Sequence, residues 1–281
     1  MASAPATFNC LWCGRPHTPR GADDLEPFAR LCPECVGRAQ DNDFLRFRLR
    51  EGLKARAAAR GAPAADHEAE MKAYYAARAA EYDDVYAGLG WPPVERAVFQ
   101  AELDAATLWL DALPLAGEIV ELAAGTGWWS PLLAQKGELS LYDAVPETLD
   151  IARQRLVAHG LRAHIHVRDA WDEPDRQVDG LFVGLWLSHV PRRRLDEFMR
   201  LARRWLKPAG IFAFIDEAPG LDYTPTIDDL QPRRLKDGRE FTIPKVYYSP
   251  VELEAALGKA RFGDVEITTT SRHFVLGKAA S

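Results

Sequence analysis

Apolar residues in the C-terminal three quarters of the chain fall into short continuous runs, separated by stretches with helical spacing. The runs cover residues 118–123, 139–142, 164–167, 180–187 and 211–215. Runs that are apolar on both faces are typical of central parallel strands, because helices cover such strands on each side. The alternation of strand and helix patterns predicts an α/β domain built on a doubly wound parallel sheet.

Helical patterns precede and separate these runs. They are expected at residues 66–87, 94–112 and 130–135, and in segments that start at Pro146 and Pro191. Ligands of doubly wound sheets bind beyond the carboxyl ends of the strands, where the strand order reverses. The residues that directly follow each apolar run are therefore the first candidates for a binding site.

All four cysteines of the chain lie in its first 35 residues. The two CxxC pairs are Cys10 with Cys13 and Cys32 with Cys35. This paired spacing is typical of a tetrahedral zinc site, and four thiolates would close the coordination shell and make the metal structural. His17 could replace one cysteine as a ligand. We predict a zinc-ribbon-like module over residues 1–40, followed by a basic helix and linker over 41–65.

Charge is distributed unevenly along the chain. Residues 1–65 carry 10 Lys and Arg against 7 Asp and Glu, whereas the remainder carries 25 against 34. An acidic main body argues against a broad nucleic-acid surface, which depends on many contacts from Lys and Arg. The composition, 47% apolar and 27% charged, is ordinary for a soluble protein, and no apolar run reaches the roughly 18 residues of a membrane span. Since the N-terminus also lacks a secretory pattern, we expect a cytoplasmic protein.

A glycine-containing turn follows the first apolar run, at Glu121-Leu122-Ala123-Ala124-Gly125-Thr126-Gly127. The turn lacks the GxGxxG pattern of dinucleotide-binding sites and the Gly-Lys-Ser/Thr of a P-loop. Its small residues allow the backbone to approach a ligand closely. Asp143, at the end of the next run, can accept hydrogen bonds from the two hydroxyls of a ribose, and Asp169 follows the third run. The combination predicts a nucleoside-binding site.

These residues resemble those of the class I S-adenosylmethionine-dependent methyltransferases. The segment from Glu121 to Gly127 is similar to the first motif of that family, with Ala123 where the family often has glycine. The resemblance covers about three quarters of the chain, and we place the methyltransferase domain at residues 66–281. It implies a Rossmann-like fold with a seven-stranded, mostly parallel sheet. One of the last two strands, at 265–270 and 274–276, is expected to run antiparallel.

The resemblance also implies roles for individual residues. Candidate residues for binding S-adenosylmethionine are Tyr74, Glu121, Ala123, Gly125, Thr126, Gly127, Asp143, Ala144, Asp169, Ala170 and Leu185. Asp143 matches the acid that binds ribose, and Asp169 with Ala170 matches the pair that contacts adenine. Tyr74 lies in a segment that resembles the family's N-terminal cap helix over the cofactor.

Candidate residues for the transfer step lie in several parts of the chain. His189, at the tip of the fourth strand, is the candidate general base for a hydroxyl acceptor, because imidazole titrates near neutral pH. Candidate substrate-binding residues are Trp128, Trp129, Trp186 and Tyr247. The stretch 219–248 is too long for an ordinary loop, so we expect it to be a lid or a substrate-binding insertion.

Three functions remain compatible with the sequence. The first is methyl transfer from S-adenosylmethionine to oxygen or nitrogen of a small-molecule acceptor, which the acidic body and the tryptophan-rich strand ends favour. The second is methylation of RNA held by the zinc module, although residues 187–190 do not form the Asn-Pro-Pro-Tyr-like tetrapeptide of base methylation. The third is a non-catalytic protein that binds the cofactor and uses the zinc module to contact a protein partner.

Overall fold

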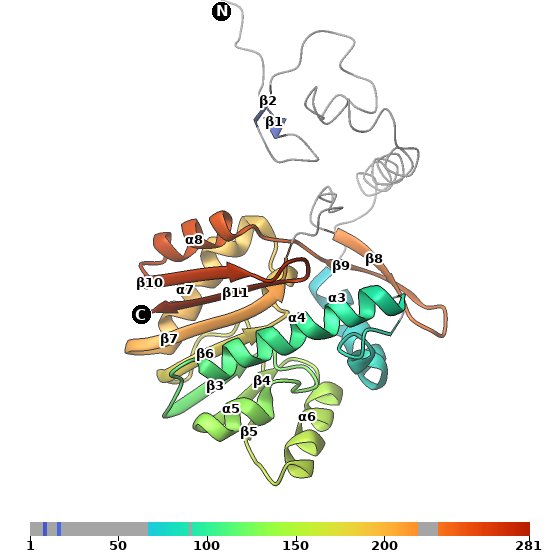
Figure 1. Cartoon of the computed structure of the whole chain (residues 1–281), viewed down its shortest axis with the longest axis horizontal. Helices are drawn as coiled ribbons and strands as arrows, with labels where there is room; N and C mark the ends of the chain where they lie inside the picture. Colours follow the sequence, from blue (N-terminus) through green and yellow to red (C-terminus); the bar gives the residue numbers. More distant parts are fainter. Residues whose placement is uncertain (1–7, 10–15, 18–66, 90–91, 219–229) are drawn as a thin grey trace, which may run out of the picture. The chain divides into compact units, whose positions relative to one another are not determined.

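The computed structural model describes residues 8–9, 16–17, 67–89, 92–218 and 230–281 (Figure 1). The chain divides into two compact units, one formed by residues 1–66 with 222–231 and the other by residues 67–221 with 232–281. The second unit holds every strand of the main sheet.

The described part of the first unit includes a pair of short strands. β1 (Phe8–Asn9) pairs antiparallel with β2 (Pro16–His17). Cys10 and Cys13 fall between these strands in the sequence, and all four cysteines lie outside the described residues. The zinc site and the linker at 41–65 therefore stay predictions.

A seven-stranded sheet forms the centre of the second unit. Its strands are β3 (Glu118–Leu122), β4 (Glu138–Asp143), β5 (His164–Val167), β6 (Val178–Gly184), β7 (Leu206–Glu217), β10 (Gly263–Thr269) and β11 (Phe274–Ala280). Their spatial order is β10-β11-β7-β6-β3-β4-β5. Every pairing is parallel except the two that β11 makes. The predicted doubly wound sheet is confirmed, and β11 is its antiparallel strand.

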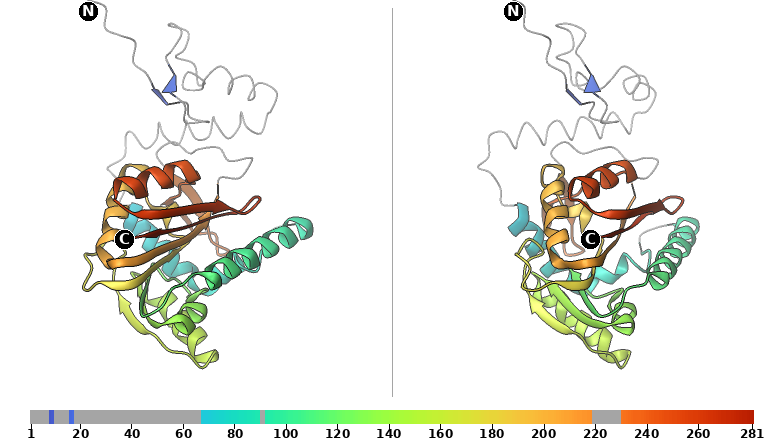
Figure 2. Two further views of the ribbon diagram at one scale, coloured as in Figure 1. Left: turned by 60° about the vertical axis from the view of Figure 1, so that its left-hand side comes forward. Right: turned by 90° about the vertical axis from the view of Figure 1, so that its left-hand side faces the viewer.

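Helices cover both faces of this sheet (Figure 2). The α-helices are α3 (His67–Arg78), α4 (Pro93–Ala112), α5 (Ser130–Lys136), α6 (Pro146–Ala158), α7 (Leu195–Trp205) and α8 (Pro250–Lys259). Side chains of α4, α5 and α6 share one hydrophobic cluster, whereas those of α7 and α8 belong to a second cluster on the other face. Across the described residues, no helix combines the length and the hydrophobicity of a membrane span.

Short 3₁₀ helices mark the places where helix boundaries differ from the prediction. The segment predicted as one helix over 66–87 begins as α3 and continues as the 3₁₀ helix η2 (Ala79–Asp84). Pro191 has an extended backbone (ψ 145°), so a 3₁₀ turn, η4 (Arg192–Arg194), precedes α7. A third one, η3 (Leu187–His189), follows β6 and carries the candidate base.

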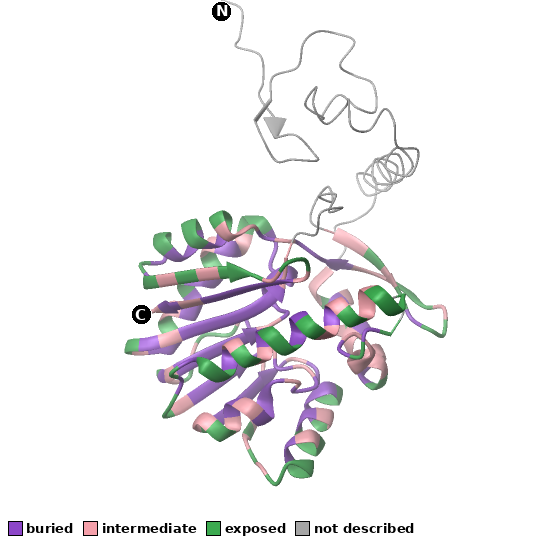
Figure 3. Ribbon diagram, viewed as in Figure 1, coloured by how far each residue is buried: buried purple, intermediate pink, exposed green. Residues whose placement is uncertain are grey.

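The core lies between the central strands and the helices on each face. Phe182, Val183, Phe212 and Phe214 on β6 and β7 are fully buried, in agreement with the continuous apolar runs of the sequence. Colouring by burial shows buried central strands, and helices that are buried along one stripe only (Figure 3). The outer strands β5 and β10 are more exposed, because each has a single neighbour in the sheet.

The predicted insertion at 219–248 contains, in its described part, a pair of strands that packs on helix α3. β8 (Leu230–Arg234) and β9 (Glu240–Pro244) form this two-stranded sheet. The backbone N–H of Thr242 in β9 donates to Glu70 Oε1 of α3 at 2.6 Å. The chain then returns to η3 (Leu187–His189), where the N–H of Val246 donates to the carbonyl oxygen of Ser188 at 2.6 Å.

The strand order reverses between β3 and β6, and this reversal positions the site. From β3 the chain builds outward to β4 and β5, and then returns to place β6 on the other side of β3. In doubly wound sheets a crevice forms at such a point, beyond the carboxyl ends of the strands.

Candidate active site

A cleft of about 690 Å³ lies at the carboxyl ends of strands β3 to β6. Residues at the strand ends that line it include Ala123, Gly125, Asp143, Ala144, Asp169, Ala170, Leu185 and Trp186. Residues 67–89, which comprise α3, η2 and the turn after them, are called the cap below. Its residues Lys72, Tyr75 and Tyr82 also line the cleft, so the site is built by the sheet and the cap together.

The turn after β3 has a backbone conformation that ordinary residues rarely adopt. Ala123, Gly125 and Gly127 have φ angles of 50°, 55° and 69°. A Cβ at Gly127 would lie 2.8 Å from both Ala152 Cβ and Ser130 Oγ, so only glycine fits there. For Ala123 the left-handed conformation costs about 1–2 kcal/mol. Such strain persists where the surroundings fix the backbone, as they often do at functional sites.

Asp143, at the end of β4, ties this turn to the sheet. Its Oδ2 accepts the Gly125 N–H at 2.8 Å, and its Oδ1 accepts the Val145 N–H at 2.8 Å. A carboxylate offers about four acceptor positions, so capacity remains for donors in the cleft. Burial raises the pKa of Asp143 to about 6, while the backbone donors act in the opposite direction. These contacts suit the ribose-binding role predicted for this residue.

Two predicted cofactor residues lie behind the cleft lining. Glu121 is buried and accepts a hydrogen bond from the Ser130 hydroxyl at 2.6 Å, and burial raises its pKa to about 8. Thr126 is 1% exposed and donates its hydroxyl to Asp83 of the cap at 2.7 Å. Both side chains therefore support the turn from behind, and neither contributes to the lining of the cleft.

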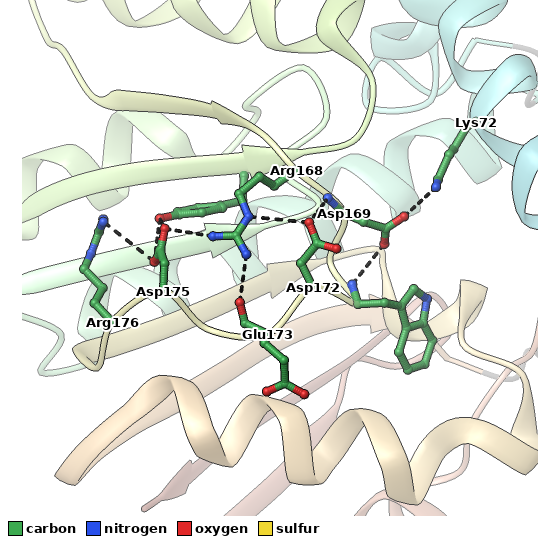
Figure 4. A network of polar contacts seen from close by, with 9 residues as sticks. Lys72, Arg168, Asp169, Asp172, Glu173, Asp175 and Arg176 are labelled. Atoms are coloured by element: carbon green, nitrogen blue, oxygen red, sulfur yellow. Dashed lines mark hydrogen bonds and ion pairs between the residues drawn. The ribbon is translucent and has the colours of Figure 1, made fainter.

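Asp169, after β5, is fixed by contacts from the cap and from its own loop (Figure 4). Its Oδ2 pairs with Nζ of Lys72 at 2.5 Å, and its Oδ1 accepts the backbone N–H of Trp171 at 2.9 Å. The neighbouring Arg168 forms an ion pair with Asp175 at 2.9 Å, which holds the loop against the sheet edge. Arg168 thus forms an ion pair within the loop, and Lys72 of the cap forms an ion pair with Asp169 of the same loop.

His189 in η3 forms a buried pair with Tyr75 of the cap. Its Nδ1 donates to the carbonyl oxygen of Pro244 at 2.7 Å, which leaves Nε2 as an acceptor. The Tyr75 hydroxyl donates to Nε2 at 2.7 Å. Burial, and then the positive charge of Lys245, lower the pKa of His189 to about 3. Burial also raises the pKa of Tyr75 well above its ordinary value, so both groups are neutral at pH 7.

Two further residues of the lining come directly after β6. Leu185 has a φ angle of 56°, and its N–H donates to the carbonyl oxygen of Ile215 at 2.8 Å, which holds the bend against β7. Trp186 lies between the His189 and Phe198 rings, with centroid distances of 6.3 and 6.2 Å. Trp186 is thus the predicted substrate-binding tryptophan that the structure places in the cleft.

The other two predicted tryptophans do not line the cleft. Trp129 is 2% exposed and packs edge-on against Phe182 in the core, with 5.8 Å between ring centroids. Trp128 stacks on Tyr86 of the cap, with centroids 4.2 Å apart and an interplanar angle of 9°. The Trp129 ring also packs against Gly184 at the end of β6, where a Cβ would lie 2.5 Å from Trp129 Cζ3. The cleft lining therefore gives no support to a substrate-binding role for either ring.

Of the two adjacent cap tyrosines, Tyr75 lines the cleft and Tyr74, the predicted one, does not. Tyr74 is 3% exposed and packs against Phe241 of β9, with 5.5 Å between centroids. Neighbouring residues of a helix point about 100° apart, and here Tyr74 faces Phe241 while Tyr75 faces the cleft. Tyr247 lies outside the lining as well, with its ring 5.4 Å from Nζ of Lys245.

The sequence prediction missed the polar stripe of the cap helix. The cap-helix residues that line the cleft are Glu68, Met71, Lys72 and Tyr75. Their spacing of i, i+3, i+4 and i+7 describes one face of a helix. This spacing is visible in the sequence. However, a helix face that mixes charged and aromatic residues can face solvent as well as a site, so only the position of the helix on the sheet identifies it as part of the cleft.

Comparisons with known proteins find similarity to methyltransferases. Residues 119–210 match a protein family described as "Methyltransferase domain". A search of curated proteins found no match. Among solved structures, the complex of DhpI with SAH is 29% identical with a TM-score of 0.62, and the similarity covers 75% of this chain and 94% of that one. The complex of DhpI with SAM and HEP is 27% identical with a TM-score of 0.65, and covers 78% and 99%.

A more distant structure shares the fold. Magnesium protoporphyrin IX methyltransferase (ChlM) from Synechocystis PCC 6803, with bound SAM, is 15% identical with a TM-score of 0.55. The similarity covers 78% of this chain and 99% of that one. By the family match and the two DhpI complexes, this chain is similar to methyltransferases that bind S-adenosylmethionine or S-adenosylhomocysteine, and its cleft lies at the strand ends.

Proposed function

We propose that this protein transfers a methyl group from S-adenosylmethionine to oxygen or nitrogen of a small-molecule acceptor. The observation that supports this most directly is a single cleft lined by the glycine turn, by two aspartates and by the His189–Tyr75 pair. The acidic balance of residues 66–281 favours a small acceptor over a polyanion. The cap also lines the cleft, which favours a ligand that fits between cap and sheet.

The strand ends supply the groups that would bind the cofactor. S-adenosylmethionine, when bound, provides a methyl group on a positively charged sulfur. Asp143 has acceptor capacity for the ribose hydroxyls, and Asp169 can accept from the adenine amino group. The electron-rich faces of Tyr75 and Tyr82 suit the positive charge. The residues of the cleft therefore fit this cofactor.

The His189–Tyr75 pair would orient the acceptor and receive its proton. With Nδ1 committed to the Pro244 carbonyl, the imidazole presents a lone pair at Nε2. A neutral imidazole of low basicity does not ionise an alcohol in advance. It can accept the proton once the oxygen or nitrogen has begun to bond to carbon and has become acidic. The Tyr75 hydroxyl, which now donates to Nε2, marks the position that an acceptor O–H or N–H would take.

Two measurements on the full chain test this proposal. Calorimetric titration with S-adenosylhomocysteine should show micromolar binding. Incubation with radiolabelled S-adenosylmethionine and a panel of hydroxylated and amine-containing small molecules should then identify an acceptor. Binding without transfer to any acceptor would favour the non-catalytic alternative, and an absence of binding would contradict the cofactor assignment.

Binding and methyl transfer measured at increasing salt concentrations distinguish RNA methylation from this proposal. If RNA is the acceptor, its affinity should fall steeply as salt increases, because binding releases counterions from the phosphates. A small neutral acceptor should show little dependence of KM on salt. A steep slope with RNA, together with methyl transfer to it, would overturn the small-molecule assignment.

We also propose that the four cysteines bind one structural zinc ion. The pairing of β1 with β2 supports this, because it places the first CxxC pair between two antiparallel strands in the sequence. Among the described residues, no group of three or more His, Cys, Asp and Glu side chains could hold a metal ion. Metal analysis of the purified chain should give one zinc per chain, and Cys13→Ser with Cys35→Ser should abolish it. Full zinc content in that double variant would contradict the proposed ligands.

A further inference from the structure

A polar latch connects the cap with the glycine turn. The Thr126 hydroxyl donates to Asp83 Oδ1 at 2.7 Å. Arg155 of α6 donates one N–H to the other oxygen of Asp83, and its Nε donates to the carbonyl oxygen of Thr126 at 3.0 Å. Thr126 is 1% exposed, and the side chain of Arg155 is 19% exposed. A residue of the cap therefore holds the central residue of the turn, although 43 positions separate them in the sequence.

Aromatic contacts join the same two segments a second time. Tyr86, three residues after Asp83, stacks on Trp128, two residues after Thr126, with 4.2 Å between ring centroids. The Arg155 guanidinium also lies over the Trp128 ring, 5.2 Å from its centroid. The latch is thus a compact contact between cap, turn and α6, made of one carboxylate, one guanidinium and two rings.

The turn itself needs such support. Three of its residues have left-handed backbone angles, and its Gly125 N–H donates to Asp143. A conformation of this kind persists only when the surroundings fix it. Asp143 fixes the turn on the sheet side, and Asp83 fixes it on the cap side.

We propose that Asp83 is a positioning residue for the cofactor turn and that it acts through the Thr126 hydroxyl. Asp83 does not line the cleft, so it contributes to affinity only by keeping the turn in its binding conformation. Cofactor affinity then depends on a closed cap, and bound cofactor in turn favours closure. The expected effect on cofactor affinity rests on the proposed function. The expected effect on the conformation of the turn in the ligand-free protein does not depend on that function.

The first test is a double-mutant cycle on the full chain, with affinity for S-adenosylhomocysteine measured by calorimetry. Asp83→Ala and Thr126→Val should each weaken binding about tenfold, as expected for loss of one charge-assisted hydrogen bond. The double variant should be about as weak as Asp83→Ala alone, because Asp83→Ala already removes the contact with Thr126. Thr126→Ser keeps the hydroxyl and should bind within about twofold of the wild type.

Asp84→Ala is the matched control. Asp84 is the neighbouring carboxylate of the cap, but it pairs with Lys236 at 2.6 Å instead of contacting the turn. The control removes the same charge from the same segment, so its affinity should equal that of the wild type. Equal losses in Asp83→Ala and Asp84→Ala, or additive losses in the double variant, would overturn the positioning role.

Hydrogen exchange of the free protein supplies a readout that needs no ligand. Asp83→Ala should speed amide exchange in residues 123–127 at least tenfold, while exchange in the strand β3 stays unchanged. If Asp83→Ala does not fold, Asp83→Asn keeps an oxygen for Thr126 and should show a smaller change in the same residues. Unchanged exchange in the turn of the folded variant would overturn the inference, whatever the wild-type protein binds.

Discussion

The cleft has two halves that hold their polar groups in different ways. The half proposed to bind adenosine, called the adenosine half below, consists of the turn at 123–127, Asp143 and Asp169, whose carboxylates accept backbone N–H groups of the turn and of their own loops. The acceptor half consists of Tyr75, His189 and Trp186, where two side chains from distant segments bond to each other. Burial raises the pKa of Asp143 in the first half to about 6, so this carboxyl group is mostly ionised at pH 7. The second half is buried and neutral, and it suits proton acceptance late in the reaction.

Asp143→Ala should have the largest effect and should act on the adenosine half alone. The variant loses the proposed ribose acceptor and leaves the N–H groups of Gly125 and Val145 without their partner. Loss of two charge-assisted hydrogen bonds of about 1.5–3 kcal/mol each weakens S-adenosylhomocysteine binding roughly 10²–10⁴-fold. Calorimetry measures this loss, with Asp143→Asn as a partial control. Affinity within threefold of the wild type would contradict the assignment of this half.

His189→Ala should show the opposite pattern. We expect kcat with an identified acceptor to fall about 10²-fold, the lower end for a residue that accepts a proton. Affinity for S-adenosylhomocysteine should change less than threefold, because the imidazole is not expected to contact adenosine. Tyr75→Phe keeps the ring and removes the donor to Nε2, so its loss of kcat should be smaller. If both variants lose cofactor affinity as strongly as Asp143→Ala, the two halves are not separate.

Glu121→Gln tests the protonation state of Glu121, which lies behind the adenosine half, through the pH dependence of the unfolding free energy. Since burial raises the pKa of Glu121 to about 8, the folded chain keeps a proton that the unfolded chain releases between about pH 4.5 and 8. Unfolding free energy should therefore fall as pH rises through this window, by at most about 1.4 kcal/mol per unit. The pKa values of Asp143 and Asp216 lie near 6, so urea titrations from pH 6.5 to 8 report mainly on Glu121. Glu121→Gln should flatten this slope, and an unchanged slope would contradict the buried, protonated state.

Lys72→Met should have the smallest effect. The Lys72–Asp169 ion pair is short, but its side chains are 42% and 21% exposed, and such pairs contribute about 0–1 kcal/mol. Urea unfolding at low salt should show a loss within that range, and the difference should vanish near 1 M salt. A larger loss, or one that salt does not screen, would mean that the cap holds Asp169 more firmly than its own loop does.

The sequence located the residues at the strand ends better than the cap residues that line the cleft, for a physical reason. Parallel strands bring their carboxyl ends together by construction, so Ala123, Asp143 and Asp169 could be grouped from their positions after apolar runs. The same argument located His189 and Trp186 after β6. Residues behind the lining, such as Thr126, belong to the same glycine turn, but their side chains do not point into the cleft. The strand pattern of the sequence does not distinguish these residues from those that line the cleft.

The family resemblance placed the cap over the cofactor site, but which cap residues line the cleft depends on tertiary contacts. The choice between Tyr74 and Tyr75 follows from the packing of Tyr74 against Phe241, a residue of the insertion. The two tryptophans of the glycine segment were expected at the cleft, but the path of the chain into α5 carries Trp129 into the core. A large aromatic side chain can pack in a hydrophobic core or line a pocket. The path of the backbone determines which of the two positions it takes.

The alanine at position 123 has a consequence for the entropy of the turn. Glycine at this position would relieve the strain of the left-handed angle, and it would also enlarge the set of conformations open to the unfolded and partly opened turn. The methyl group of Ala123 removes mainly left-handed conformations from that set, so the turn depends on its surrounding contacts to hold the φ angle of 50°. A turn with alanine at this position therefore loses its shape more completely than one with glycine when those contacts open.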